Sequence, residues 1–176
     1  MPDRRIVLTR FVSGFAAIAA LGLSIPFIRS LFPARQPEHY RDIDISSLRS
    51  GLSLKANWLG RPVIIVARSD EQLAELNQPD RDDLLDPDSI SSTQPEFARN
   101  PTRSRQSGYF LAFANCTHLG CEVLVDEKGG FNCPCHESRF DAAGRIRQGG
   151  AAKRNLEIPD YRFAGPGTIR LINRRR

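Results

Sequence analysis

Two short segments stand out in this chain, Cys116-Thr117-His118-Leu119-Gly120-Cys121 and Cys133-Pro134-Cys135-His136. They hold all four cysteines and two of the three histidines of the 176-residue sequence. Six such donors exceed the four that a tetrahedral zinc site uses, so two of them need another role. The simplest arrangement places two cysteines and two histidines on a binuclear iron-sulfur cluster and joins the other two cysteines in a disulfide.

The spacing within each segment supports a binuclear cluster. A cysteine precedes a histidine closely in both, Cys116 before His118 and Cys133 before His136, so each segment can offer one ligand to each iron. Two imidazoles in place of thiolates make the site less anionic and raise its reduction potential to roughly −150 to +300 mV. Two alternatives stay open. One is a zinc site, although neither zinc-ribbon nor C2H2 spacing occurs; the other is a framework of two disulfides, which a chain of this length hardly needs.

Both segments resemble the cluster-binding boxes of Rieske iron-sulfur proteins, C-T-H-L-G-C and C-P-C-H-x-S. Nearly the whole chain is similar to the Rieske subunit of proteobacterial ubiquinol-cytochrome c reductase, the cytochrome bc complex. The segments that carry this wider similarity are Ile25-Pro26-Phe27-Ile28, Trp58-Leu59-Gly60-Arg61-Pro62-Val63, Asp86-Pro87 and Gln94-Pro95-Glu96-Phe97. The resemblance implies an all-β Rieske domain of small antiparallel sheets, with a cluster-binding subdomain, a helix-loop insertion and one N-terminal transmembrane helix.

The ligands of the 2Fe-2S cluster are expected to divide by type. Cys116 and Cys133 would bind the inner iron, and His118 and His136 the outer iron, where the second nitrogen of each ring faces solvent. An oxidised cluster favours deprotonated imidazole and a reduced cluster favours protonated imidazole, so electron transfer is coupled to proton transfer. By resemblance, His136 contacts the quinol and accepts its proton.

A hairpin is expected to bring the two segments together. Lys128-Gly129-Gly130 fits a turn between strands that carry the segments at adjacent strand ends. A disulfide from Cys121 to Cys135 would then tie one segment to the other, hold the ligands together and restrict water. An oxidising compartment such as the periplasm permits this bond.

The function implied by the resemblance is electron transfer from ubiquinol through the cluster to a c-type cytochrome, with proton release on the periplasmic side. The expected partners are cytochrome b, a membrane c-type cytochrome, ubiquinol and the lipid bilayer, in a dimeric complex. The alternative is a divergent Rieske electron carrier that serves another periplasmic membrane oxidoreductase and has no quinol site of its own.

The N-terminus, residues 1–32, is predicted to be a twin-arginine signal anchor. Arg4-Arg5 is followed by an uncharged stretch from Phe11 to Ile28, which as a helix would span about 27 Å of the ~30 Å hydrocarbon core. The stretch is longer than the apolar core of a cleaved signal peptide, so an uncleaved transmembrane helix is favoured. Arginines before it place the N-terminus in the cytoplasm and the remaining chain in the periplasm, on a single-pass protein of the inner membrane.

Residues 33–45, polar and with two prolines, are predicted to be a flexible hinge tether, and His39 within them an ordinary solvent-facing residue. Residues 46–176 are predicted to form the Rieske domain, with the cluster-binding part at about 114–156. The formal net charge is +5, with acidic residues in excess over residues 38–100 and basic residues in excess over residues 131–176. A membrane anchor and an exported metal site argue against nucleic acid as a partner.

Alternating and β-branched runs predict strands rather than helices for most of the domain. These runs are residues 52–58, 62–67, 109–114, 122–125, 131–133 and 168–172. One helix is predicted, because Ser69-Asp70-Glu71-Gln72 has the pattern of a capping box. Residues 78–107, rich in Pro, Asp, Ser and Arg, are expected to form a long insertion with turns.

Three residues after the second segment are expected to tune the potential. Glu137 stands where relatives have Gly, so it brings a carboxylate and a side chain to a position that needs backbone freedom. Ser138 can donate its hydroxyl to cluster sulfur. Phe140 replaces a Tyr whose hydroxyl donates to a ligand sulfur in relatives of higher potential, and the loss of that donor lowers the potential.

The cover over the cluster also departs from the family. Relatives read G-x-P-A-P-x-N-L, whereas residues 149–156 have Ala151 and Lys153 in place of the two prolines. The cover is therefore expected to be more flexible. Lys153 and Arg154 add positive charge near the docking face. Together these changes predict a potential below that of relatives that have the tyrosine and the prolines.

Overall fold

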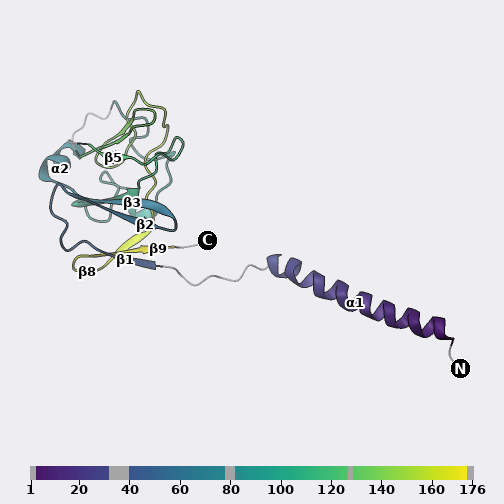
Figure 1. Cartoon of the computed structure of the whole chain (residues 1–176). Coiled ribbons are helices and arrows are strands. Elements are labelled where there is room, and N and C mark those ends of the chain that lie inside the picture. The colour runs from purple at the N-terminus through teal and green to yellow at the C-terminus, as the bar shows by residue number, and fades with distance from the viewer. Residues whose placement is uncertain (1–2, 32–39, 78–81, 127–128, 174–176) are drawn as a thin grey trace. The chain divides into compact units, whose positions relative to one another are not determined.

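The computed structural model describes residues 3–31, 40–77, 82–126 and 129–173. The chain divides into two units, Met1–Pro37 and Glu38–Arg176. The first contains helix α1, Arg4–Leu31, and the second contains all the strands (Figure 1).

Helix α1 is long and apolar enough to cross a membrane. Its 28 residues correspond to about 42 Å of helix, more than the ~30 Å hydrocarbon core. None of its residues is buried, and the large side chains of Phe15 and Phe27 are 72% and 73% exposed. Because so much uncovered apolar surface is unfavourable in water, the structure agrees with the predicted single-pass anchor.

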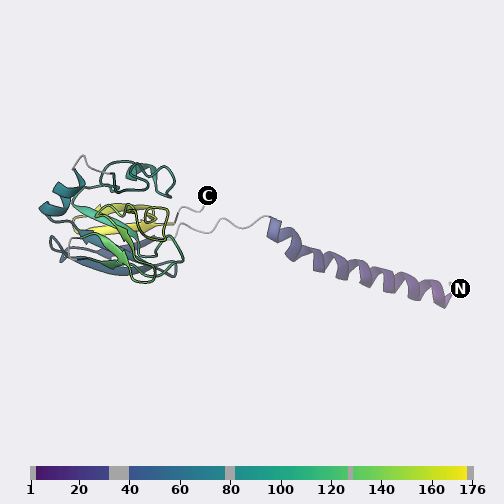
Figure 2. The same ribbon diagram turned by 90° about the horizontal axis from the view of Figure 1, so that it is seen from above.

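Three small antiparallel sheets form the second unit, which confirms the predicted all-β class (Figures 1 and 2). The first sheet has the order β1-β9-β8, with the bounds Tyr40–Asp44, Thr168–Ile172 and Tyr161–Gly165. The second has the order β2-β3-β4, with the bounds Ser53–Trp58, Arg61–Ala67 and Tyr109–Phe113. The third has the order β5-β6-β7, with the bounds Leu124–Val125, Phe131–Cys133 and Ser138–Phe140.

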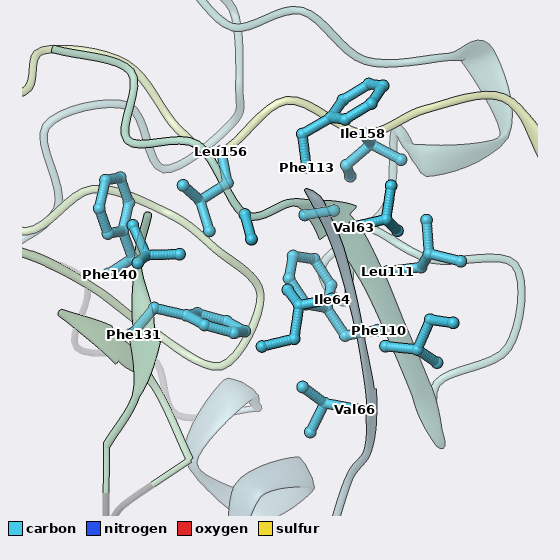
Figure 3. Packing of buried hydrophobic residues seen from close by; sticks show 14 of the residues in the cluster. Val63, Ile64, Val66, Phe110, Leu111, Phe113, Phe131, Phe140, Leu156 and Ile158 are labelled. Atoms are coloured by element: carbon cyan, nitrogen blue, oxygen red, sulfur yellow. The ribbon is translucent and has the colours of Figure 1, made fainter. Parts of the chain in front are cut away.

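Strand β3 is the central strand of the second sheet and supplies much of the core. Val63, Ile64 and Ile65 on it are fully buried, as expected for a β-branched run covered on both faces. Figure 3 shows Phe110 of β4 and Phe131 of β6 in this core, and their ring centroids are 5.5 Å apart. The contact fixes the third sheet onto the second.

Residues Tyr40–Asp44, which the sequence places in a tether over residues 33–45, form strand β1. All five have register partners on β9. The Arg170 guanidinium donates to both carboxylate oxygens of Asp42, at 2.6 Å each. These partners are 128 residues apart, so no local pattern reveals the strand. Ile45, after the strand, is buried and its amide donates to the Gly167 carbonyl at 2.7 Å. Residues 33–39 of the tether, with His39, lie outside the described part of the chain.

The predicted capping box begins helix α2, Asp70–Leu76. The Ser69 hydroxyl accepts from the Gln72 amide and the Gln72 side chain accepts from the Ser69 amide. Of the predicted insertion, residues 78–81 lie outside the described residues. From residue 82 onward it has turns, an isolated β-bridge from Leu84 to Arg147 and one short 3-10 helix, η1, Glu96–Ala98.

Candidate metal centre

The first cysteine-histidine segment, loop 1 (residues 116–121), follows strand β4 and closes on itself. The Cys116 amide donates to the Cys121 carbonyl at 2.7 Å, and the Gly120 amide donates to the Cys116 carbonyl at 2.9 Å. Gly120 has φ +83°, a conformation that glycine adopts without steric cost. Within this loop Cys116 is buried and His118 is exposed.

The second segment, loop 2 (residues 133–138), turns from strand β6 into β7. Cys133 and Ser138 are register partners, so the turn lies between them. Cys133 is buried and His136 is exposed, which repeats the arrangement of loop 1.

Glu137 occupies the strained position of this turn. It has φ +54°, in the left-handed region that favours glycine. For a residue with a Cβ this conformation costs roughly 1–2 kcal/mol. The structure thus supports the expectation that this position needs glycine-like backbone freedom. With Glu137 here, the backbone is strained.

The two buried thiols are neighbours. Cys116 and Cys133 are the free cysteines, and their sulfurs are within hydrogen-bond contact. Burial raises the pKa of the Cys116 thiol; the His118 backbone amide opposes this shift, and the Cys133 contact adds to it. Two such thiols become thiolates when a metal centre supplies the compensating positive charge.

The two imidazoles also meet. The ring centroids of His118 and His136 are 4.8 Å apart and the rings stand edge to face, at 85°. The site therefore has a buried pair of sulfur donors and an exposed pair of nitrogen donors, one of each from each loop. This is the donor set of a cluster with two cysteine and two histidine ligands.

Cys121 and Cys135 are joined in a disulfide between loop 1 and loop 2. Three sulfurs, those of Cys121, Cys133 and Cys135, lie within 4.8 Å of one another and resemble part of a zinc site. Because two of these three sulfurs are bonded to each other, they are not available as thiolate ligands. Four donors remain, and they fit a binuclear cluster.

Known proteins match the chain in the same region and over nearly its full length. A family profile described as Rieske [2Fe-2S] domain matches residues 96–162. The chain is 40% identical to the ubiquinol-cytochrome c reductase iron-sulfur subunit of Allochromatium vinosum, over 94% of this chain and 86% of that one. The chain belongs to this family of Rieske iron-sulfur subunits. The subunits of the same name from Blastochloris viridis and Rickettsia conorii are 35% and 31% identical, over 89% and 96% of this chain and 87% and 92% of theirs.

Membership of the Rieske family establishes the cofactor as a [2Fe-2S] cluster and the class of protein as an oxidoreductase subunit. It also agrees with the membrane anchor, since the similarity to the Allochromatium subunit extends over almost the whole chain.

Ser138 is the register partner of Cys133 and lies beside the Cys116 thiol. It is fully buried, and its hydroxyl, as a hydrogen-bonding neighbour, opposes the upward shift in the pKa of the Cys116 thiol. The same oxygen accepts from the Ala152 amide at 2.9 Å. Phe140 is also buried, next to Phe131 across the β6–β7 pair, and offers no donor (Figure 3).

Phe140→Tyr is expected to raise the midpoint potential. A new hydroxyl donor to ligand sulfur would favour the more negative, reduced cluster by roughly 1.5 kcal/mol, equivalent to about 60 mV for one electron. A redox titration of the full-length protein measures the shift. Tyr161→Phe, which removes a phenol hydrogen-bonded to the Arg105 amide away from the loops, is the matched control and should leave the potential unchanged.

The proline-free cover (residues 149–156) is held by hydrogen bonds to both loops. Its Ala152 amide donates to Ser138 of loop 2, and its Arg154 carbonyl accepts from the Thr117 hydroxyl of loop 1 at 2.5 Å. Gly150 approaches so closely that an added Cβ would lie 2.5 Å from the Ser138 Cα. Greater flexibility of this cover stays a prediction, as does the lower potential.

Two buried arginines support the centre from outside the loops, and neither was predicted. Arg103 donates to carbonyls in the turn 142–144 after β7 and to the carbonyl of Leu156 in the cover. Arg68 donates to the same turn. Burial lowers the pKa of both to about 10, so both remain charged at neutral pH. The carbonyls of the turn and of the cover that they bind are between 40 and 74 residues away in the sequence, so they leave no local signal.

Proposed function

We propose that this Rieske subunit transfers electrons from ubiquinol to a membrane c-type cytochrome within the cytochrome bc complex and releases the protons of the quinol on the periplasmic side. The observation that carries the proposal is the exposed pair of imidazoles, His118 and His136, beside two buried thiols. A site that takes both an electron and a proton from a diffusible quinol needs a proton acceptor at the surface and sulfur ligands away from water. The names of the relatives, ubiquinol-cytochrome c reductase subunits, support the same reading.

The cluster would be held by Cys116 and Cys133 on one iron and by His118 and His136 on the other. When bound, it supplies a reversible one-electron acceptor in the Rieske range. The protein residues around it orient the ligands: the disulfide ties the loops together, and the Ser138 hydroxyl fixes the Cys116 sulfur.

His136 would accept the proton of the quinol hydroxyl on the ring nitrogen that faces solvent, and would later release it to water. Its exposure allows a quinol to reach it. Leu119, next to His118 in loop 1, is 73% exposed and offers an apolar contact for the quinol ring or for the protein surface around it.

The orientation proposed for the membrane follows from charge and from the disulfide. Arg4, Arg5 and Arg10 favour a cytoplasmic N-terminus, so the domain after α1 would be periplasmic. A disulfide between Cys121 and Cys135 suits that oxidising compartment.

Leu119→Glu tests the proposed function without removing a ligand. In membranes whose only copy of the chain carries this change, the spectroscopic signal of the cluster should persist. Quinol-dependent cytochrome c reduction should fall at least about tenfold, or ~1.4 kcal/mol, because a carboxylate is poorly accommodated in an apolar contact. Leu52→Glu is the matched control, since Leu52 is 54% exposed and lies before strand β2, outside the loops.

If membranes that lack the chain altogether reduce cytochrome c with quinol at the normal rate, the proposal is wrong. The chain would then serve another membrane oxidoreductase as an electron carrier without its own quinol site.

A further inference from the structure

Asn155, near the end of the cover, is a buried residue whose side chain makes three hydrogen bonds. It is 1% exposed. Its Oδ1 accepts from the Ile146 amide, and its Nδ2 donates to the Asp86 carbonyl and to the Ser89 hydroxyl, each at 2.8 Å. Its backbone amide donates to the Ser92 hydroxyl at 2.9 Å. Three of these four partners belong to residues 86–92 of the insertion, which we call the clasp loop.

The clasp loop is organised around one carboxylate. Asp86 is buried, and its two oxygens accept from the amides of Ile90 and Ser91 and from the hydroxyl of Ser92. This arrangement directs the Ser92 oxygen toward the amide of Asn155. A carboxylate that accepts three local hydrogen bonds holds a loop of turns in one conformation.

Ser89 completes the clasp at the expense of backbone strain. It has φ +56°, which is uncommon for a residue with a Cβ, and it is only 8% exposed. Its hydroxyl reaches Nδ2 of Asn155 from this conformation. Strained residues of this kind persist where the surrounding structure fixes them, often close to functional sites.

The clasp loop is connected to the metal centre through the cover. Asn155 fixes the segment whose Ala152 amide donates to the Ser138 hydroxyl, and that hydroxyl contacts the Cys116 sulfur. Gly150 in the same segment lies directly against Ser138. The cover has no proline rings to restrict its backbone. The hydrogen bonds to the clasp loop therefore hold the Ala152 amide and Gly150 in place against Ser138.

We infer that Asn155 and the clasp loop are positioning residues of the Rieske centre, which hold the Ser138 hydroxyl against the Cys116 sulfur and thereby set the potential of the cluster. The inference rests on the proposed role of Cys116 as a ligand. Loss of the clasp weakens a hydrogen bond that favours the reduced, more negative cluster, and therefore lowers the potential.

Ser92→Ala and Ser92→Thr form the first test, in the full-length, cluster-loaded protein. The alanine variant lacks the oxygen that receives the Asn155 amide. We expect a fall in midpoint potential equivalent to about a threefold change in the reduction equilibrium, ~28 mV at 59 mV per tenfold. Amide hydrogen exchange in residues 150–156 should be several-fold faster. Threonine keeps the hydroxyl and should restore both values, and equal values for alanine and threonine would contradict the inference.

Ser89→Gly separates positioning from stability. Glycine adopts φ +56° without strain but has no hydroxyl for Asn155, so the melting temperature should change little while the potential falls and exchange rises. Ile169→Val is a control for stability, because Ile169 on β9 is fully buried in the core. This variant should have a lower melting temperature and an unchanged potential. A Ser89→Gly potential equal to that of the wild type would overturn the inference. If instead the wild-type protein does not use Cys116 as a cluster ligand, the proposed ligand set is wrong.

Discussion

Replacing both Cys121 and Cys135 by alanine is expected to lower the free energy of unfolding by about 3 kcal/mol, the value for a closed loop of roughly 15 residues. The two residues are 14 positions apart, and their bond is the covalent link between loop 1 and loop 2. Without it, the two loops that carry the four ligands are held together only by non-covalent contacts. The double variant is preferable to a single one, because it leaves no unpaired thiol to react.

Two measurements check this prediction. Denaturant unfolding of the full-length protein gives the stability change, and iron content after incubation at moderate temperature shows whether the loops still retain the cluster. Titration of the unfolded, non-reduced, cluster-free wild type should count two reactive thiols, those of Cys116 and Cys133. A count of four would refute the bridge, and unchanged stability in the double variant would contradict its structural role.

The local sequence was sufficient to predict an element when the residues that interact lie close together in the same motif. Loops 1 and 2 each place a cysteine and a histidine within a few residues, and the structure brings the two loops together with the thiols buried and the imidazoles exposed. The capping box at Ser69 is equally local, and helix α2 begins there. The apolar stretch at the N-terminus likewise forms a helix long enough to cross a membrane.

Elements that depend on distant partners were not predicted. Strand β1 pairs with β9 at the other end of the domain, and the polar residues Tyr40–Asp44 have no apolar run of their own. Strands β7 and β8 were missed as well; β7 has three residues, and its pattern is masked by the second metal-binding box. Such short strands form because they pair with neighbouring strands and pack against the core. A local sequence pattern does not show these contacts.

The residues that support the site were hidden for the same reason. Arg103 and Asn155 are buried, but both lie in segments that look like polar loops. Their hydrogen-bond partners, which include a side-chain amide, a backbone amide and a backbone carbonyl, are between 9 and 69 residues away. A polar residue in a loop is usually solvated, so only the folded structure distinguishes these two from their exposed neighbours.

The change with the largest effect on function is expected at His136. His136→Ala removes both a proposed ligand of the outer iron and the proposed proton acceptor, so the Rieske signal and the activity should be lost together. His39→Ala, which changes the third histidine of the chain, is the matched control and should preserve both. Both variants carry the same chemical change, histidine to alanine, so a difference between them reports the role of the position.

The decisive measurement is the rate of quinol-dependent cytochrome c reduction in membranes whose only copy of the chain carries His136→Ala. The proposed function predicts a rate at the background of membranes without the chain, at least about a hundredfold below the wild type, or ~2.7 kcal/mol. A rate close to that of the wild type would contradict the assignment of His136 and, with it, the proposed route from quinol to cytochrome.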